Sequence, residues 1–271
     1  MNGYLIYRKE DYRKNRWFAN HIIEIFKLNN LNVELLIFEH ILIVQKTNVL
    51  IYYKNKELNK YDFVLNRTRD YNLAYTFEKL NYKVFNNSKL SRITNDKYSS
   101  YQFCTNLGIN SLATELYFNG IKYHDKVCVK KRNGYGGSEV YLVNGQKELD
   151  QFDDNYIVQK YNDKIIGDIR TYIINNKIIA SIIRKKNEDF RTNVSLGAIA
   201  ELYVISKELE DMINIILSNL KCDFVGIDFL IDEANNLYFN EIEDVVGCRS
   251  LYDKSDIDII KILSNYIKSE L

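Results

Sequence analysis

The stretch from Phe224 to Asp244 constrains the fold of this chain more than any other. Two runs rich in β-branched and aromatic residues flank a polar turn over Asp232–Asn236, the pattern of a β-hairpin. Because strand side chains alternate between two faces, we expect Asp228 to lie opposite Glu241, with Glu243 on the same face. Facing like charges are destabilising, so a cation should lie between them. Carboxylate oxygens suit Mg²⁺ or Mn²⁺ better than zinc, which predicts a metal site here unless the face is simply solvated.

Composition limits the class of protein to which the chain can belong. Its 271 residues suffice for one large domain or two to three small ones. The fractions of hydrophobic residues (46%) and charged residues (27%) are ordinary for a globular protein. The 37 basic and 36 acidic residues nearly cancel, so the chain as a whole lacks the net positive charge that would attract nucleic acid or a membrane surface. No apolar run approaches ~18 residues. Four widely spaced cysteines and three histidines favour reduced thiols over a zinc site. We therefore expect a cytoplasmic protein without nucleic-acid or membrane partners.

The first part of the chain alternates strand and helix patterns, which predicts a parallel or mixed α/β sheet. Strand patterns include Gly3–Tyr7 and Asp62–Asn66, and apolar residues at helical spacing predict a helix over Asn15–Leu28. Loops after strand ends commonly carry ligand contacts in such folds. Arg67 and Arg69 follow a strand in this way, and either contact an anionic substrate or are two surface arginines.

The middle of the chain combines two lysines with a glycine-rich loop. A helix is expected over Ser91–Leu107, with Lys97 in its first turn, where the helix dipole disfavours a cation unless an anion lies near. Lys130 ends a strand just before the loop Asn133–Ser138, which contains three glycines. Glycines let backbone amides approach an anion and let a loop close as a lid, although the pattern is neither a Walker A motif nor G-x-G-x-x-G. A plain hairpin turn is the alternative.

A second hairpin carries most of the arginines. Asp168–Ile174 and Lys177–Ile183 flank Asn175-Asn176, a two-residue turn signal. The basic residues that gather at or beyond its open end are Arg170, Arg184, Lys185, Lys186 and Arg191. Several arginines with one balancing carboxylate indicate anion binding, although a solvated hairpin edge would look similar.

Together these motifs resemble the ATP-grasp superfamily, most closely its RimK-like branch of carboxylate–amine ligases. The segments that carry the resemblance are DIRTYIINNKIIASIIR, DFRTN and GIDFL…FNEIEDVVG. It covers Lys97 to Tyr252, and Tyr4–Leu90 resembles the α/β domain that precedes such enzymes. The resemblance implies an α/β (α+β ATP-grasp) fold with three parts. These are an N-terminal α/β domain (1–90), a small lobe with the glycine-rich lid (91–160) and a C-terminal lobe with the metal site (161–271).

The same resemblance implies a reaction. ATP would phosphorylate a substrate carboxylate, and an amine would attack the acyl phosphate to give an amide, ADP and phosphate. The implied catalytic residues are Arg184, Lys130 and Arg170. The implied ATP-binding residues are Lys97, Lys130, Gly136, Gly137, Lys160, Tyr161, Asp168, Arg191 and Asn193. The implied ligands of Mg²⁺ or Mn²⁺ are Asp228, Glu241 and Glu243. Partners would be small-molecule or peptide carboxylates and amines, and assembly would be as a homodimer or homotetramer.

Three positions depart from the family pattern. Lys131 replaces the usual proline, Lys160 replaces an acidic residue, and Glu243 replaces a common asparagine. The extra negative charge of Glu243 should either tighten metal binding or require a second ion. Two alternatives stay open: an ATP-dependent kinase or other phosphotransferase on the same fold, and a catalytically inactive nucleotide-binding regulatory protein. Comparing ADP release with and without an amine acceptor distinguishes them.

Overall fold

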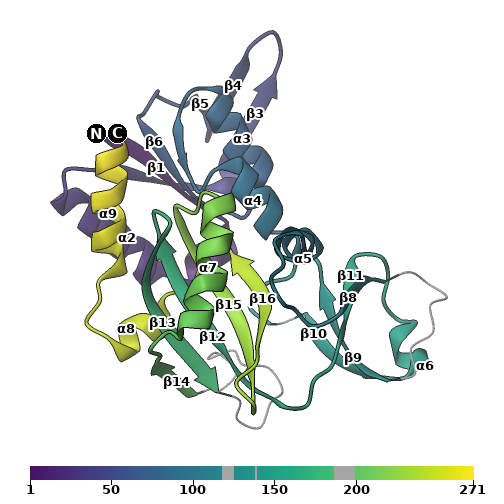
Figure 1. Cartoon of the computed structure of the whole chain (residues 1–271). Coiled ribbons are helices and arrows are strands. Elements are labelled where there is room, and N and C mark those ends of the chain that lie inside the picture. Colours follow the sequence, from purple (N-terminus) through teal and green to yellow (C-terminus); the bar gives the residue numbers. More distant parts are fainter. Residues whose placement is uncertain (118–124, 138, 186–198) are drawn as a thin grey trace.

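The structure of the chain, a computed structural model, describes residues 1–117, 125–137, 139–185 and 199–271 (Figure 1). It contains a parallel sheet at the N-terminus, two antiparallel sheets, and a small three-stranded sheet that projects from the first (Figure 1). The fold class is the one expected from the sequence.

The N-terminal sheet is entirely parallel, with strand order β2-β1-β6-β7. Its strands are β1 (Asn2–Tyr7), β2 (Asn32–Ile37), β6 (Phe63–Arg67) and β7 (Lys83–Phe85). The helices of this region are α1 (Lys9–Lys14), α2 (Arg16–Leu28), the 3₁₀ helix η1 (Phe38–His40) and α3 (Tyr71–Lys79). The other strands are β3 (Ile41–Gln45), β4 (Val49–Tyr53) and β5 (Lys56–Glu57). The predicted alternation of strands and helices is therefore confirmed, although β3 to β5 form a sheet of their own.

The glycine-rich loop belongs to a four-stranded antiparallel sheet of order β10-β9-β11-β8. Its elements are β8 (Thr114–Leu116), β9 (Lys126–Lys131), β10 (Val140–Asn144), α6 (Gln146–Leu149) and β11 (Tyr156–Lys160). The single helix expected over Ser91–Leu107 is wrong, because two helices occupy this region, α4 (Ser88–Thr94) and α5 (Lys97–Asn106). Asp96 separates them, and its side chain accepts a hydrogen bond from the backbone amide of Tyr98 as the cap of α5.

The C-terminal part is built on a five-stranded antiparallel sheet of order β14-β13-β12-β15-β16. The strands are β12 (Ile165–Ile174), β13 (Lys177–Lys185), β14 (Ile199–Leu202), β15 (Phe224–Asp232) and β16 (Leu237–Glu243). The helices are α7 (Lys207–Asn219), α8 (Arg249–Lys254) and α9 (Ile259–Glu270). Asn175 and Asn176 have φ angles of 51° and 54°, so both occupy the left-handed region that a tight two-residue hairpin turn requires. Both predicted hairpins are confirmed.

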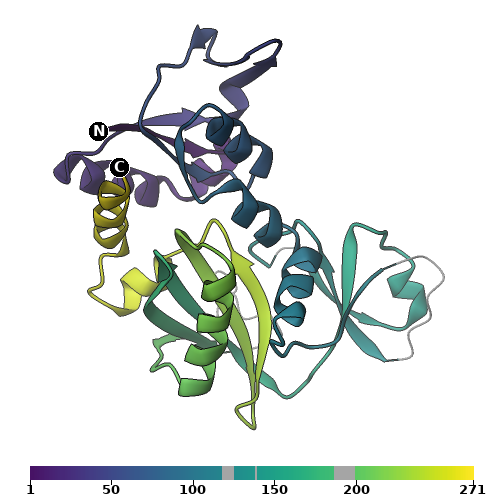
Figure 2. The same ribbon diagram turned by 45° about the horizontal axis from the view of Figure 1, so that its top comes forward.

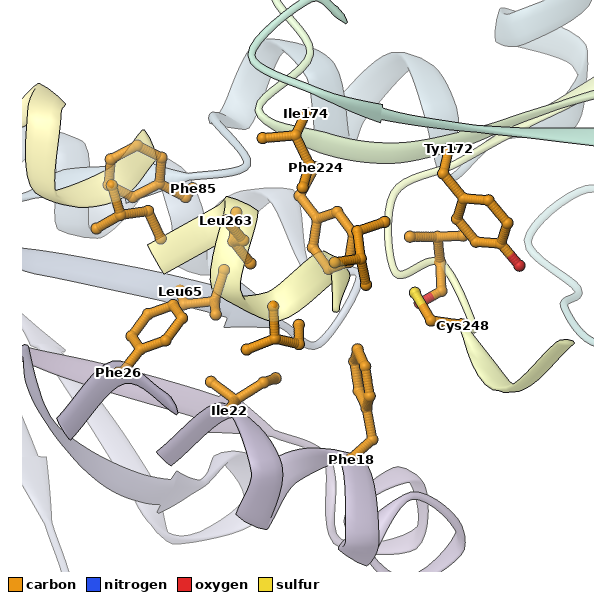
Figure 3. Packing of buried hydrophobic residues seen from close by; sticks show 14 of the residues in the cluster. Phe18, Ile22, Phe26, Leu65, Phe85, Tyr172, Ile174, Phe224, Cys248 and Leu263 are labelled. Carbon is orange, nitrogen blue, oxygen red and sulfur yellow. The ribbon is translucent and has the colours of Figure 1, made fainter. Parts of the chain in front are cut away.

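One hydrophobic core joins the first sheet to the last. Helix α9 returns to pack against α2, which places the two chain ends near each other (Figures 1 and 2). Figure 3 shows Phe18, Ile22 and Phe26 of α2 facing Leu263 of α9, with Phe224 of β15 in the same core. These side chains are at most 8% exposed. The predicted division into three domains remains a prediction.

The five-stranded sheet has two different faces. Helix α7 covers one of them with an apolar cluster that includes Ile169, Ile173 and Ile227 of the sheet. The residues that alternate with these, such as Asp168 and Arg170, point to the other face. Within the described ranges, no helix is long and apolar enough to cross a membrane.

Candidate active site

Four charged side chains meet on the polar face of the five-stranded sheet. The strand register sets Asp168 of β12 opposite Arg184 of β13, and Arg170 of β12 opposite Asp228 of β15. Asp168 and Arg170 are two residues apart, so they share one face. All four residues are at most 6% exposed. Charges this deeply buried are stable only when paired and hydrogen-bonded.

The two arginines satisfy this requirement together. Arg170 binds Asp228 with two hydrogen bonds, from Nε to Oδ1 at 2.9 Å and from Nη2 to Oδ2 at 2.6 Å. Arg184 donates from Nη2 to the same Asp228 Oδ2 at 2.7 Å and also pairs with Asp168 through both Nε and Nη2. Burial alone would raise the pKa of Asp228, but the two arginines outweigh it and hold that pKa below its ordinary value. Asp228 is therefore ionised at neutral pH.

The opposition of Asp228 and Glu241 predicted from the sequence is confirmed. Glu243 lies farther along the same strand, opposite Gly226. The ladder shifts register between Asp228 and Phe229, and Asn240 has no partner on β15. This extra residue is a β-bulge, a feature common beside active sites.

The two glutamates also face cations. Glu241 Oε2 is 3.2 Å from Lys97 Nζ, and Glu243 Oε2 is 2.7 Å from Arg170 Nη1. Burial would raise the pKa of Glu241, but Lys97 chiefly, with other nearby cations, outweighs it and lowers that pKa. For Glu243 burial prevails and the pKa is raised. Cationic side chains therefore contact both glutamates, and the predicted metal between the carboxylates remains a prediction.

The carboxylates fit a divalent metal by their chemistry. All donors are oxygens, and the buried Glu243 Oε2 accepts no well-formed hydrogen bond from any described residue, which leaves a lone pair for a further partner. As they stand, the carboxylates point at cations, and no group of three or more His, Cys, Asp or Glu in the described ranges is arranged around a metal. Binding Mg²⁺ would therefore exchange some of these ion pairs for metal–oxygen bonds.

A pocket adjoins the network between the glycine-loop sheet and the β15–β16 hairpin. It encloses about 870 Å³ of empty space, part of it open to solvent. Seven of the predicted site residues line it, namely Lys97, Lys130, Gly136, Gly137, Lys160, Tyr161 and Glu241. Glu241 thus belongs both to the pocket wall and to the charged face of the sheet.

The lysines and glycines occupy the places that anion binding requires. Lys97 Nζ donates to the carbonyl oxygen of Gly134 at 2.5 Å, and Lys130 Nζ donates to Asn240 Oδ1 at 2.8 Å. Burial works against the charge of Lys130, yet its surroundings outweigh it and the pKa is raised. Gly136 and Gly137 have φ angles of 67° and 72°, a conformation that suits glycine alone.

The remaining predicted site residues lie elsewhere. Asp168, Arg170, Arg184, Asp228 and Glu243 form the buried network beside the pocket without lining it. Two further predicted nucleotide contacts, Arg191 and Asn193, are outside the described residues.

The sequence patterns missed the apolar wall of the pocket and Asn240. The apolar wall consists of Leu112, Cys128, Val140, Ile165 and Leu230. Cys128 and Leu230 had a usable signal, because each lies two residues from a predicted site residue, Lys130 or Asp228, on the same strand and must share its face.

Comparison with known proteins decides the family. Residues 98–267 match the RimK-like ATP-grasp domain. The chain belongs to the RimK-like ATP-grasp family. Its relatives include the uncharacterized protein MG011 of Mycoplasma genitalium, 30% identical over 268 residues, which span 97% of this chain and 90% of that protein. They also include the alpha-aminoadipate–LysW ligase LysX of Sulfurisphaera tokodaii, 26% identical over 238 residues, or 79% and 83% of the two chains.

Solved structures agree with this assignment. The D-alanine–D-alanine ligase of Bacillus anthracis, complexed with ATP, superposes with a TM-score of 0.71 at 18% identity and covers 99% of this chain and 96% of its own. The ATP-grasp ligase PsnB, complexed with a precursor variant, Mg and ADP, superposes with a TM-score of 0.69 at 11% identity. The match covers 99% of this chain and 98% of PsnB. These likenesses confirm the ATP-grasp fold. This RimK-like protein is a ligase of the class that forms carbon–nitrogen bonds, as predicted.

Proposed function

We propose that this RimK-like ligase joins a carboxylate to an amine through an acyl phosphate, with ATP and Mg²⁺ at the site described above. The observation that carries the proposal is the position of Glu241, which faces the pocket with Lys97 and is paired with Asp228 on the charged sheet. A nucleotide in the pocket and the buried arginines would therefore act on the same phosphate group.

The pocket suggests how ATP would lie. The apolar wall around Leu112 and Cys128, next to the strand end at Lys160 and Tyr161, suits the adenine ring. Lys97, with the glycine loop, suits the phosphates, because lysine side chains and the backbone amides of glycine-rich loops are groups that bind phosphate oxygens in proteins. Solved ligases of the same fold that are complexed with ATP, or with Mg and ADP, support a nucleotide here by analogy.

Asp228, Glu241 and Glu243 would hold the divalent cation. Bound Mg²⁺ would neutralise charge on the phosphate oxygens during transfer. Hard oxygen donors are the appropriate set for this ion.

The reaction needs charge neutralisation and positioning more than acid–base chemistry. The substrate carboxylate attacks the γ-phosphorus and ADP leaves; the amine nitrogen then attacks the acyl carbon, phosphate leaves, and the nitrogen loses a proton. We assign Arg184 to the transferring phosphoryl group, since its planar guanidinium can bind two oxygens at once. Arg170 contacts Asp228 and Glu243 together, so we assign it to positioning these carboxylates. The glycine loop would exclude water from the acyl phosphate.

The test is ADP release in the presence of candidate carboxylates, with and without an amine, and with hydroxylamine as a trap for the acyl phosphate. We expect hydroxamate to form with the correct carboxylate, and amide to replace it when the amine is added. A stable phosphorylated product without amide would favour the kinase alternative. Tight nucleotide binding without any turnover would favour the regulatory one. Asp228→Asn should abolish hydroxamate formation, whereas Glu233→Asn, in the exposed turn of the same hairpin, should not.

We also propose a cytoplasmic location. Cys104, Cys128, Cys222 and Cys248 are all buried and free, as is usual in a reducing compartment.

A further inference from the structure

A buried carboxylate directly follows the last predicted metal ligand and has no role in the function proposed above. Asp244 comes one residue after Glu243, the end of β16, and is 2% exposed. In the described part of the chain, the donors that satisfy its carboxylate are all neutral. Asn86 Nδ2 donates to Oδ1 at 2.7 Å, while Ser91 Oγ and Asn95 Nδ2 donate to Oδ2 at 2.6 and 2.8 Å. Burying a carboxylate without a cation is costly, so its position here requires a reason.

The three donors all belong to the segment by which the chain leaves the N-terminal sheet. Asn86 directly follows β7, Ser91 lies in α4, and Asn95 is the C-cap of α4. Helices α4 and α5 contact β16, beside which they lie in Figures 1 and 2. Asp244 therefore connects the end of β16 to the segment between the N-terminal sheet and α5.

Asn86 also holds together the open end of the β15–β16 hairpin. Its Oδ1 accepts a hydrogen bond from the backbone amide of Phe224, the first residue of β15, at 2.7 Å. Its Nδ2 donates to the backbone carbonyl oxygens of Phe224 and Asp244, at 2.7 and 3.0 Å, as well as to the Asp244 carboxylate. One amide side chain thus contacts both strands at the end of the hairpin that lies farthest from its turn.

Glu243 depends on these contacts because β16 ends with it. Its pairing with Gly226 is the last step of the ladder with β15 in the described ranges, and the chain then turns back across β15. A Cβ atom at Gly226 would lie 2.7 Å from Cγ2 of Val246, which shows how closely the returning chain approaches that strand. The backbone of Glu243 is therefore fixed by the ladder on one side and by the Asp244 contacts on the other.

The Asp244 contacts differ from the ion pair of Lys97 with Glu241, which also joins α5 to β16. In the proposed function Lys97 turns to the phosphates and Glu241 to the metal, so this ion pair is exchanged for contacts with the ligands. No group in the proposed reaction competes for the donors that bind Asp244. These contacts can therefore keep the end of β16 in place while the ion pair is broken.

We propose that Asp244 is a positioning residue for the metal site and acts through Glu243. This inference rests on the proposed function and adds to it a residue that touches neither nucleotide nor metal. Hydrogen bonds from the segment before α5 fix Asp244, and its peptide bond to Glu243 carries this restraint to the ligand. Groups that orient a ligand without touching the metal contribute roughly 10–100-fold to metal affinity.

The hydrogen bonds require a carboxylate at this position. Amide nitrogens lie at both of its oxygens, Asn86 Nδ2 at Oδ1 and Asn95 Nδ2 at Oδ2. An asparagine has one acceptor oxygen, so in either orientation its own NH₂ group would face one of these two amides. Asp244→Asn therefore keeps the size of the side chain and breaks at least one of the contacts.

The test measures how much a metal improves nucleotide binding. We define the metal gain as the Kd of a non-hydrolysable ATP analogue in EDTA divided by its Kd in excess Mg²⁺, both from calorimetry at constant ionic strength. Asp244→Asn should reduce the metal gain about tenfold and leave the Kd in EDTA within about twofold of its normal value.

Asp223→Asn is the matched control. Asp223 is also a carboxylate that is 2% exposed, and it directly precedes Phe224 at the same end of the hairpin. Its hydrogen bond comes from the hydroxyl of Tyr266 in α9, at 2.5 Å, and not from the segment before α5. The same exchange of carboxylate for amide should therefore leave the metal gain unchanged.

A double-mutant cycle tests whether Asp244 acts through Glu243. Glu243→Gln removes the predicted ligand and should itself reduce the metal gain. In that background Asp244→Asn should change the metal gain by about twofold or less, whereas independent effects would multiply in full. Ser91→Ala removes only one donor to Asp244, should reduce the metal gain about threefold, and decides the question if Asp244→Asn does not fold.

Three results would overturn the inference. One is a normal metal gain in Asp244→Asn or, if that variant does not fold, in Ser91→Ala. Another is an equal loss in Asp223→Asn, which would make the effect one of general stability. The third is an Asp244→Asn effect that keeps its full size in the Glu243→Gln background. Failure of the proposed function would look different, because the unmutated protein would then bind no analogue or show no metal gain, and the inference would fall with it.

Discussion

Free Mg²⁺ should stabilise this protein very little unless a nucleotide is also present. The reason is that the candidate metal ligands already have partners. The network holds four carboxylates and four cations, which sum to no net charge: Asp168, Asp228, Glu241 and Glu243 with Lys97, Lys130, Arg170 and Arg184. A lone Mg²⁺ would displace a cation from a buried carboxylate and leave that cation unpaired, at a cost of several kcal/mol.

ATP changes this balance because its phosphates offer new partners to the displaced cations. A ligand at ~100 times its dissociation constant adds ~2.7 kcal/mol to the free energy of unfolding. For a chain of this size each kcal/mol raises Tm by about 2–4 °C. Mg²⁺ with a non-hydrolysable ATP analogue should therefore raise Tm by about 5–10 °C, provided that the chain unfolds as one unit.

Differential scanning calorimetry under four conditions checks this expectation: no ligand, Mg²⁺ alone, analogue with EDTA, and both together. Only the last condition should give the full shift. Glu241→Gln removes one predicted metal ligand, so this variant should show little of the Mg²⁺-dependent rise in Tm. Glu233→Gln, in the exposed turn of the same hairpin, should behave as the unmutated protein. A full shift with Mg²⁺ alone, or one that persists in EDTA, would refute the reasoning.

Three substitutions test single contacts. Arg184→Lys keeps the charge but loses the planar fork, and ADP release should fall by at least ~100-fold while nucleotide affinity, measured by calorimetry, changes only a few-fold; near-normal turnover would exclude the assigned role. Gly136→Ala meets no neighbour but forces alanine to a φ of 67°, so urea unfolding of the free protein should show a loss of ~1–2 kcal/mol; no loss would show that this position does not hold that conformation in solution. Tyr266→Phe deprives the buried Asp223 of its 2.5 Å donor and should cost ~1–3 kcal/mol in urea unfolding; no loss would show that Asp223 is satisfied in another way.

Local patterns in the sequence predicted much of the fold and of the candidate site. Both hairpins follow from alternation and turn residues, which act over a few positions. Asp228 and Glu241 could be assigned to facing strands of one hairpin, although their direct pairing also depends on a bulge that the local pattern does not show. Lys97 and Lys130 could be assigned only through the resemblance of the whole series of motifs, since each alone is a weak signal.

The partners of the carboxylates could not be predicted in this way. Arg170 meets Asp228 because β12 pairs with β15, although 58 residues separate them. Nothing in the local pattern of either strand specifies this pairing. The sequence indicated a cation near the carboxylates but not that arginine and lysine would contact them, and the metal site remains a prediction. The apolar wall of the pocket was missed for the same reason, because several separate segments build it.

Alternation alone does not explain the register of the central hairpin. Ile231 pairs with Leu237 at the turn, and an unbroken ladder from that pair would set Asp228 opposite Asn240. The bulge at Asn240 advances the register by one residue, so that Glu241 takes the place beside Asp228. It also turns both Asn240 and Glu241 toward the pocket, where Asn240 accepts the hydrogen bond of Lys130. A single inserted residue therefore aligns the predicted metal ligands and holds a predicted phosphate-binding lysine, which couples the two halves of the site through one strand.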